Sequence, residues 1–92
     1  MNRKRDRLEI IHDMLIVIQK KGRKVKPTHI MYKANLSSQM LADYLQEMLK
    51  RGFVLEIEEK NSRKTYSLTD KGFRYLTDYA AVRGFVDSYG LD

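Results

Sequence analysis

The sequence predicts a small, mostly helical α+β domain that ends in a long helix. Apolar residues recur at helical spacing in the first half of the chain, an alternating segment follows, and the last part is again helical in period. With 92 residues, the chain has room for one hydrophobic core and one domain. Glycine, proline and asparagine separate these segments, and no repeat or low-complexity stretch interrupts them.

The first predicted helix spans 6–21. Asp6 is its expected N-cap, and Glu9 follows three residues later, as in a capping box. Its apolar residues form two adjacent stripes, which is typical of a helix that is central to a core or contacts a second subunit. The two stripes are Leu8, Ile11, Leu15 and Ile18, and Ile10, Met14 and Val17.

A short helix at 27–34 and a longer one at 37–51 are predicted next. The short helix opens on a proline, whose missing N–H needs no partner at that position. Asn35 and Gly52 suit the left-handed conformation that ends a helix, and Ser37 suits an N-cap. The apolar face of the longer helix consists of Leu41, Leu45, Met48 and Leu49.

A β-hairpin is predicted after the longer helix. Its two strands are separated by a polar turn at 59–63, and the second strand spans 64–68 with Tyr66 and Leu68 on its buried face. The first strand has a two-residue period. In it, Phe53, Leu55 and Ile57 alternate with Val54, Glu56 and Glu58.

The last helix begins after Thr69, a residue suited to an N-cap, and runs to about 88. Two helices joined by a tight turn and followed by a hairpin define the winged helix-turn-helix arrangement. The fold class is therefore an α+β, mostly helical winged helix-turn-helix with a C-terminal helix. The single domain, 1–92, divides into a basic arm at 1–5, a winged-helix core at 6–68 and the C-terminal helix at 69–92.

The positive charge is concentrated at the start of the chain. The net charge is +6, and nine of the 18 basic residues lie in 1–26, which contains only three acids. This concentration favours a polyanionic partner, although a lysine-rich surface that only aids solubility has the same count. No cysteine is present, so thiolate metal sites and disulfides are excluded. Without a signal-peptide pattern or a spanning apolar run, a cytoplasmic, nucleoid-associated location is expected.

Three segments of the sequence together carry a resemblance to a known protein family. They are KVKPTHIMYKANLS at 24–37, GFV at 52–54 and YSLTDKG at 66–72. Together they resemble archaeal winged helix-turn-helix proteins that are predicted transcriptional regulators. The last pattern recurs across many winged-helix families, so it supports the fold more than a particular regulator. Related dimeric members are chromatin-like proteins that pair through a C-terminal helix. The resemblance therefore implies that this chain binds double-stranded DNA and forms a homodimer.

In such a protein, 37–51 is the recognition helix, whose N-terminal residues reach base edges in the major groove. Gln39 can pair bidentately with adenine, and Ser38 can bond to a base or a phosphate. Asp43 and Glu47 lie on or near the same face and repel phosphate, so these polar residues can also be interpreted as merely solvated. Because the helix is nearly neutral, other segments have to supply the attraction for DNA.

The cations of the wing at 59–64 and of the loop before the second helix supply that attraction. A hairpin tip of this kind enters the minor groove or follows the backbone, whereas the acids beside it also fit an ordinary loop. Arg3, Lys4, Arg5 and Arg7 of the arm, and Lys20, Lys21 and Arg23, add to the positive surface. The residues expected to contact DNA are Lys24, Lys26, Thr28, Lys33, Ser37, Ser38, Gln39, Lys60, Asn61, Arg63 and Lys64.

The last helix carries two apolar stripes. Phe73, Leu76 and Ala80 are expected on the core of the chain itself. The second stripe repeats at alternating spacings of four and three, as in a heptad seam, and we expect it to pair with its two-fold mate. The alternative is that it folds back along the first helix. The expected dimer residues are Tyr75, Tyr79, Val82, Val86 and Tyr89, and Gly84 would allow close approach.

Catalysis is not predicted. His12 and His29 lie on different helices without a carboxylate cluster, and no phosphate-binding loop or nucleophile elbow is present. We expect no metal, cofactor or membrane partner, and no small-molecule partner is evident, because so short a chain leaves no obvious room for a ligand pocket. Double-stranded DNA and a second copy are the expected partners. The alternatives are a winged-helix adaptor for protein–protein contacts and a non-specific, chromatin-like DNA binder.

Overall fold

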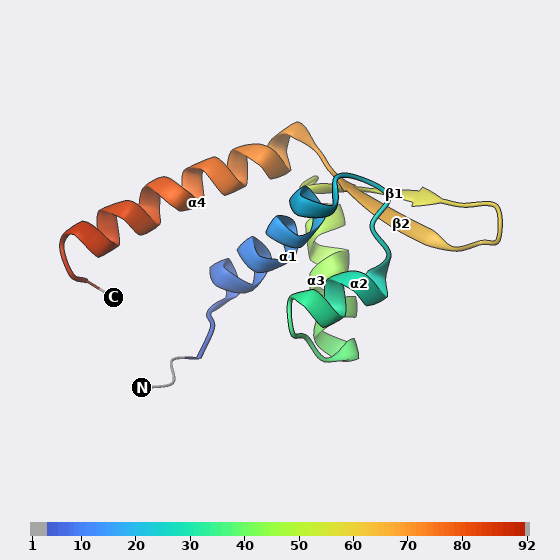
Figure 1. Ribbon diagram of the computed structural model, residues 1–92, viewed down its shortest axis with the longest axis horizontal. Helices are drawn as coiled ribbons and strands as arrows, with labels where there is room; N and C mark the ends of the chain where they lie inside the picture. Colours follow the sequence, from blue (N-terminus) through green and yellow to red (C-terminus); the bar gives the residue numbers. More distant parts are fainter. Residues whose placement is uncertain (1–3, 92) are drawn as a thin grey trace.

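Four helices and one β-hairpin make up the fold, in the predicted order (Figure 1). The computed structural model describes residues 4–91, so Arg3 of the predicted arm lies outside the described residues. The elements are α1 (Arg7–Lys21), α2 (Pro27–Lys33), α3 (Ser38–Lys50), β1 (Val54–Glu58), β2 (Lys64–Leu68) and α4 (Asp70–Ser88).

Side-chain caps begin three of the helices at the predicted positions. Asp6, Ser37 and Thr69 each accept a hydrogen bond from the backbone N–H three residues later, at 2.8, 3.1 and 3.0 Å. Each cap satisfies a donor that has no partner inside its helix. Asn35 and Gly52 follow α2 and α3 with positive φ angles of 57° and 78°. The predicted left-handed conformation at both helix ends is therefore confirmed.

The core is built around α1, which contacts α2, β2 and α4. Met14, Leu15 and Ile18 on this helix are fully buried, together with Ile30 of α2 and Met48 of α3. This placement confirms that the wide apolar arc of the first helix is central to the core. None of the helices in the described part of the chain is long and apolar enough to cross a membrane.

The strand pairing, and not the alternation, decides which residue of β1 is buried. Val54 is buried, whereas Leu55 is 58% exposed. The strands pair antiparallel with Val54 opposite Leu68, and cross-strand partners point to the same side of a sheet. Because Tyr66 and Leu68 turn toward the helices, Val54 turns inward with them and Leu55 turns outward.

A backbone pairing that the sequence pattern did not indicate joins the loop after α1 to the hairpin. The N–H of Val25 donates to the carbonyl of Tyr66, and the N–H of Tyr66 donates to the carbonyl of Val25, each at 2.9 Å. The preceding residue, Lys24, has a positive φ of 57°, and its N–H donates to the Ser67 hydroxyl at 3.2 Å. This loop is therefore fixed against β2.

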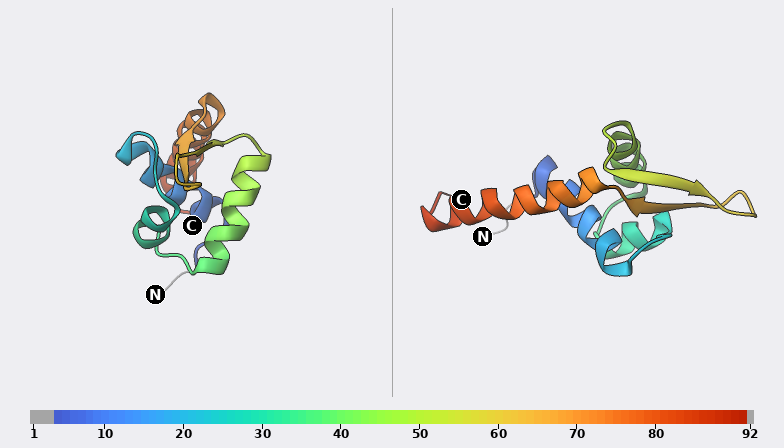
Figure 2. Two further views of the ribbon diagram at one scale, coloured as in Figure 1. Left: turned by 90° about the vertical axis from the view of Figure 1, so that its right-hand side faces the viewer. Right: turned by 90° about the horizontal axis from the view of Figure 1, so that it is seen from above.

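The long final helix buries a different face from the one predicted. Leu76 is buried as expected, but Phe73 is 47% exposed and Ala80 is exposed, so the expectation for these two residues is wrong. The reason is that α4 turns its tyrosine-bearing stripe toward α1 instead. Its second half projects from the body at the end opposite the wing (Figures 1 and 2), and the molecule measures 49 × 28 × 22 Å.

Candidate nucleic-acid interface

The outer face of α3 is polar and accessible. Ser38, Gln39, Ala42, Asp43 and Gln46 are all exposed, as the apolar periodicity predicts. Their helix is held from beneath by its buried stripe, and its N-terminus is fixed by the Ser37 cap. A rigid helix with a row of hydrogen-bonding side chains on its open face has the chemistry needed to meet base edges.

Gln39 is hydrogen-bonded to a neighbouring side chain on this face. Its Nε2 donates to Asp43 Oδ1, one turn further along α3, at 3.0 Å. One amide hydrogen and the amide oxygen of Gln39 remain available to an outside partner. The carboxylate of Asp43 therefore favours one orientation of the amide. The spacing of four residues allows this contact, but the sequence analysis did not predict it.

The other acid near this face, Glu47, is neutralised within the chain. Its carboxylate pairs with the guanidinium of Arg7 at the start of α1, and with Arg51 Nε at 3.3 Å. Both cations come from segments that frame α3. The repulsion of phosphate expected from this residue is therefore reduced, and Arg7 serves α3 instead of acting as a free arm residue.

The wing ends in an exposed cationic tip. Lys60, Asn61, Ser62 and Arg63 are exposed, and Ser62 adopts a positive φ of 58° in the turn. Neither Lys60 nor Arg63 takes part in an ion pair among residues 4–91, whereas Lys64 lies 3.6 Å from a Glu56 carboxylate oxygen. Two of the three predicted wing cations are thus unpaired and point toward solvent.

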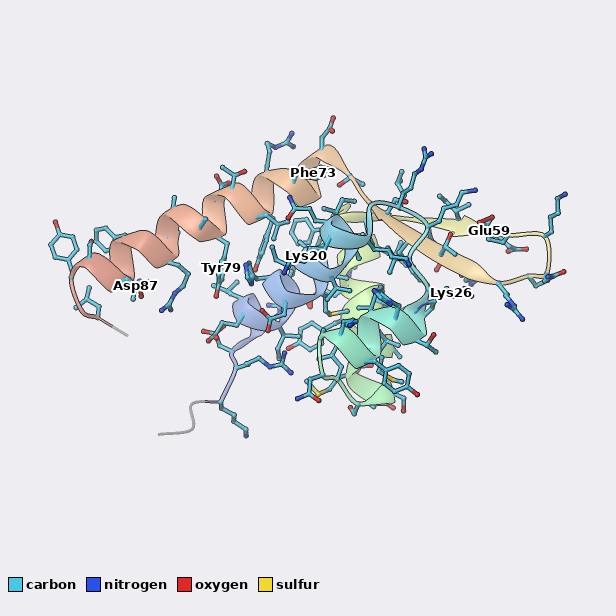
Figure 3. All side chains as sticks on the ribbon, viewed as in Figure 1. Lys20, Lys26, Glu59, Phe73, Tyr79 and Asp87 are labelled. Carbon is cyan, nitrogen blue, oxygen red and sulfur yellow. The ribbon has the colours of Figure 1, made fainter. Side chains whose placement is uncertain are left out.

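The loop before α2 lies beside the wing because of the backbone pairing at Val25. Lys24 Nζ lies 3.8 Å from Glu59 Oε1, which bridges the loop to the start of the turn. Lys26 and Thr28 are exposed at the beginning of α2. The structure therefore places these predicted contact residues at the same end of the molecule as the wing, as Figure 3 shows for Lys26 and Glu59.

Lys33 belongs to a different part of the surface. It lines a groove between α1 and α2 together with Lys20 and Lys21 of α1. No residue of α3 or of the wing lines that groove. The predicted DNA-contacting residues therefore do not form one continuous surface, because the structure does not place Lys33 with the wing tip.

Arg5 of the predicted arm is a structural clamp. Its Nη1 lies 2.9 Å from Asp13 Oδ2 and donates to the carbonyl of Ala34 at 2.7 Å, and its Nη2 donates to the carbonyl of Asn35 at 2.9 Å. The guanidinium thus binds carbonyls at the C-terminal end of α2, where helix carbonyls lack partners. Arg5 thus binds the chain itself, whereas the prediction was a basic arm that adds to the positive surface.

The two histidines do not form a metal site. His12 stacks on Tyr79 with ring centroids 4.3 Å apart, and its Nδ1 lies 3.1 Å from Asp13 Oδ1. Among the described residues, no group of three or more histidine, cysteine, aspartate or glutamate side chains has the arrangement needed to hold a metal ion. The structure therefore gives His12 a packing role between α1 and α4.

The residues of the expected dimer stripe have two different environments. Some contact α1 of the same chain, and others are exposed. Tyr79 points from α4 toward α1 (Figure 3), and the Tyr75 hydroxyl donates to the carbonyl of Leu8 at 2.8 Å. Burial raises the pKa of Tyr75 to about 12 and also raises the pKa of Tyr79. Val82 and Tyr89 are exposed, at 56% and 69%.

An apolar groove of about 380 Å³ lies along this junction of α1 and α4. It is lined by Leu8, Tyr75, Tyr79, Val82 and Val86, with charged residues at its edge. Leu8, Phe85 and Leu91 are large exposed apolar residues that the heptad spacing did not select. The sequence feature that could have identified Leu8 as an exposed apolar residue is the unusually wide apolar arc of the first helix.

The sequence matches the family model described as winged helix-turn-helix over residues 4–86. This match covers most of the chain, and the three helices and hairpin described above have the same arrangement. The chain belongs to the winged helix-turn-helix family. The helix-turn-helix of this winged-helix protein is formed by α2 and α3, and its wing is formed by β1 and β2.

Solved structures extend this comparison. Sso10a-2, a DNA-binding protein from Sulfolobus solfataricus, is 26% identical with a TM-score of 0.77, and the match covers 94% of this chain and 90% of that protein. A predicted transcriptional regulator from Pseudomonas aeruginosa is 23% identical with a TM-score of 0.72, and the match covers 95% of this chain and 60% of the other.

A more distant relative shares the fold alone. MepR, a transcription regulator of the Staphylococcus aureus multidrug efflux pump MepA, is 10% identical with a TM-score of 0.72. The match covers 87% of this winged-helix chain and 59% of MepR. No curated protein sequence matches this chain.

Proposed function

We propose that this winged-helix protein binds double-stranded DNA as a homodimer and regulates transcription, acting by binding and not by catalysis. The observation that carries the proposal is the polar, exposed face of α3, which belongs to the same body from which the cationic wing extends. A helix needs such a face to read the major groove, and flanking cations hold the adjacent phosphates. The likeness to Sso10a-2, a DNA-binding protein, supports this function.

The roles divide between reading and attraction. Ser38 and Gln39 are proposed to reach base edges, and Ser37 caps the helix beside them. The proposed phosphate contacts are Lys26, Thr28, Lys60, Asn61 and Arg63, with smaller contributions from Lys24 and Lys64 because each pairs with a glutamate of the hairpin. The predicted contact from Lys33 is the least supported, since its side chain lines a groove away from the wing.

Dimerisation is proposed through the second half of α4. Val82 and Phe85 of α4, with Tyr89 and Leu91 just after its end, are each more than half exposed, and the groove beside Leu8 continues this apolar surface. A monomer rarely leaves such large apolar residues grouped in water. Because this surface lies opposite the wing, pairing through it leaves both recognition helices free for one duplex.

The test is a titration with double-stranded DNA at two salt concentrations. Because phosphate contacts release counterions, we expect affinity to fall steeply as salt rises. A comparison of random and genomic duplexes then separates a sequence-specific regulator from a chromatin-like binder. Failure to bind any duplex at low salt would contradict the proposal and favour a protein–protein adaptor, for which the acid Asp43 on α3 is the supporting feature.

A further inference from the structure

A groove of about 770 Å³ lies between α1 and α2, and of the proposed DNA contacts only Lys33, the least supported one, lines it. The sequence predicts no ligand pocket in a chain this short, and the structure departs from that expectation. This volume lies in the range of small-molecule sites, which are commonly between about 300 and 1,000 Å³. The groove is open along one side, so a ligand can enter without movement of either helix.

The floor of this groove is apolar. Ile16 and Val17 of α1 are half-buried, and Ala34 at the end of α2 is buried beside them. Both Ile16 and Val17 pack against the core, and both keep part of their surface accessible where they line the groove. An apolar ligand surface placed here would therefore remove exposed carbon from water.

The rim of the groove is positively charged. Lys20, Lys21 and Lys33 line it, and none of the three takes part in an ion pair among the described residues. The one acid in the lining, Asp13, already pairs with Arg5 at 2.9 Å. His29 adds a half-buried ring nitrogen on the α2 side. The groove thus offers several cationic donors and no free carboxylate.

We propose that the groove binds a small amphipathic organic anion, with its apolar body on Ile16 and Val17 and its carboxylate held by Lys20 and Lys33. A concave apolar floor with a few convergent charges is the usual construction of a small-ligand site. A phosphate backbone would use the lysines but would leave the floor uncovered. This site is independent of the DNA proposal, because binding is measured without DNA.

The experiment uses three probes with the full chain: octanoate, 1-octanol and inorganic phosphate. They separate the amphipathic ligand from its apolar body alone and from its charge alone. Binding is followed by two-dimensional ¹H–¹⁵N NMR of the labelled protein. We expect octanoate to bind most tightly of the three and to shift the amide signals of Ile16, Val17 and Ala34.

Two matched double variants test the cationic rim. Lys20→Gln with Lys33→Gln removes both proposed carboxylate ligands, and we expect octanoate affinity to fall about tenfold, as for the loss of charge-assisted contacts. Lys50→Gln with Lys60→Gln removes the same charge from the end of α3 and from the wing, and octanoate affinity is expected to stay within about twofold.

Several results would overturn the proposal. They are equal affinity for octanoate and octanol, equal losses in the two double variants, and signal shifts centred on the α4 groove at Leu8 and Val82. Absence of octanoate binding at millimolar concentration would overturn it as well. Because each readout is ligand binding, failure here leaves the DNA-binding proposal standing.

Discussion

At the scale of single residues, the hydrogen bonds of Thr69 and the close packing of Gly72 fix the junction between the wing and α4. Thr69 caps α4 and also donates from its hydroxyl to the carbonyl of Gly52 at 2.5 Å, while its N–H donates to the carbonyl of Phe53 at 3.1 Å. Gly72, one turn into the helix, packs against the same backbone. These contacts fix the direction in which α4 leaves the wing.

Gly72→Ala is expected to destabilise the fold by about 2 kcal/mol or more, because overpacking against backbone cannot relax by a rotamer change. A Cβ at this position would lie 2.3 Å from the Phe53 carbonyl oxygen. The matched control is Arg74→Ala in the same helix, at an exposed position, which should change stability by less than about 0.5 kcal/mol. Chemical denaturation measures both, and equal stabilities would contradict the close approach.

Tyr66 is expected to make the stability of the fold decline at alkaline pH. Burial, together with its hydrogen bond to Glu56 at 2.8 Å, raises the pKa of Tyr66 from 10.0 to about 12. The folded state therefore keeps a proton that the unfolded state loses, and this stabilisation is complete below pH 10 and lost as pH rises to 12. We expect Tyr66→Phe to show a smaller decline in unfolding free energy over that interval than wild type.

The control for this pH dependence is Tyr32→Phe, at a tyrosine that is 76% exposed. Its decline should parallel that of wild type, when each variant is measured by denaturation at several alkaline pH values. Tyr75 has the same shift to about 12, so Tyr75→Phe should act like Tyr66→Phe. A Tyr66→Phe curve parallel to wild type would show that burial does not protect this hydroxyl.

At the scale of elements, the helix-turn-helix and the wing are positioned by loops as much as by regular structure. The pairing of Val25 with Tyr66 fixes the loop against β2, and the Arg5 clamp fixes the end of α2 to α1. Both contacts join segments that are distant in sequence. They hold α2 relative to the wing and to α1, and a DNA-reading surface needs such fixed positions because bases and phosphates have fixed spacing.

The wing is expected to supply sequence-independent attraction. Arg63→Ala should weaken DNA binding by roughly threefold to tenfold on every duplex and reduce the salt slope by about one. Lys64→Ala should have the smaller effect because Lys64 pairs with Glu56 at 3.6 Å. Arg74→Ala on α4 is the matched control for lost charge. An effect of Arg63→Ala no larger than that of Arg74→Ala would contradict the wing contact.

The recognition helix is expected to supply sequence preference. Gln39→Ala should relax the choice of base at one position by about 1–3 kcal/mol, because the amide held by Asp43 no longer pairs with adenine. Gln46→Ala is the same change two turns further along the exposed face and should alter preference less. Binding to a panel of single-base variants measures both. A uniform loss after Gln39→Ala would instead identify a backbone contact.

At the scale of the whole molecule, the two ends of an elongated body carry different chemistry (Figure 2). The wing tip is cationic and the open face of α3 is polar, whereas the second half of α4 and the residue after it expose the large side chains of Phe85 and Tyr89, whose ring centroids lie 5.0 Å apart. Neither surface competes with the other for space. A dimer through the apolar end therefore presents two copies of the polar end.

Wild-type protein is expected to sediment as a dimer at micromolar concentration, and Val82→Glu with Phe85→Glu should convert it to a monomer. Charges placed on an apolar interface lose hydration without gaining a partner, so association is weakened strongly. Arg74→Asp, elsewhere on α4, should stay dimeric. Sedimentation of the wild-type chain as a monomer would count decisively against pairing through this helix.

The sequence by itself determined the order of the elements, their caps and the buried stripes of α1 and α3. These features are local: a cap, a left-handed residue and a period of 3.6 residues act over one or two turns. Only the tertiary structure decided the inner face of the hairpin, the stripe of α4 that meets α1, and the clamp formed by Arg5. Each depends on how distant segments pack. A period identifies an apolar face but does not say which neighbour covers it.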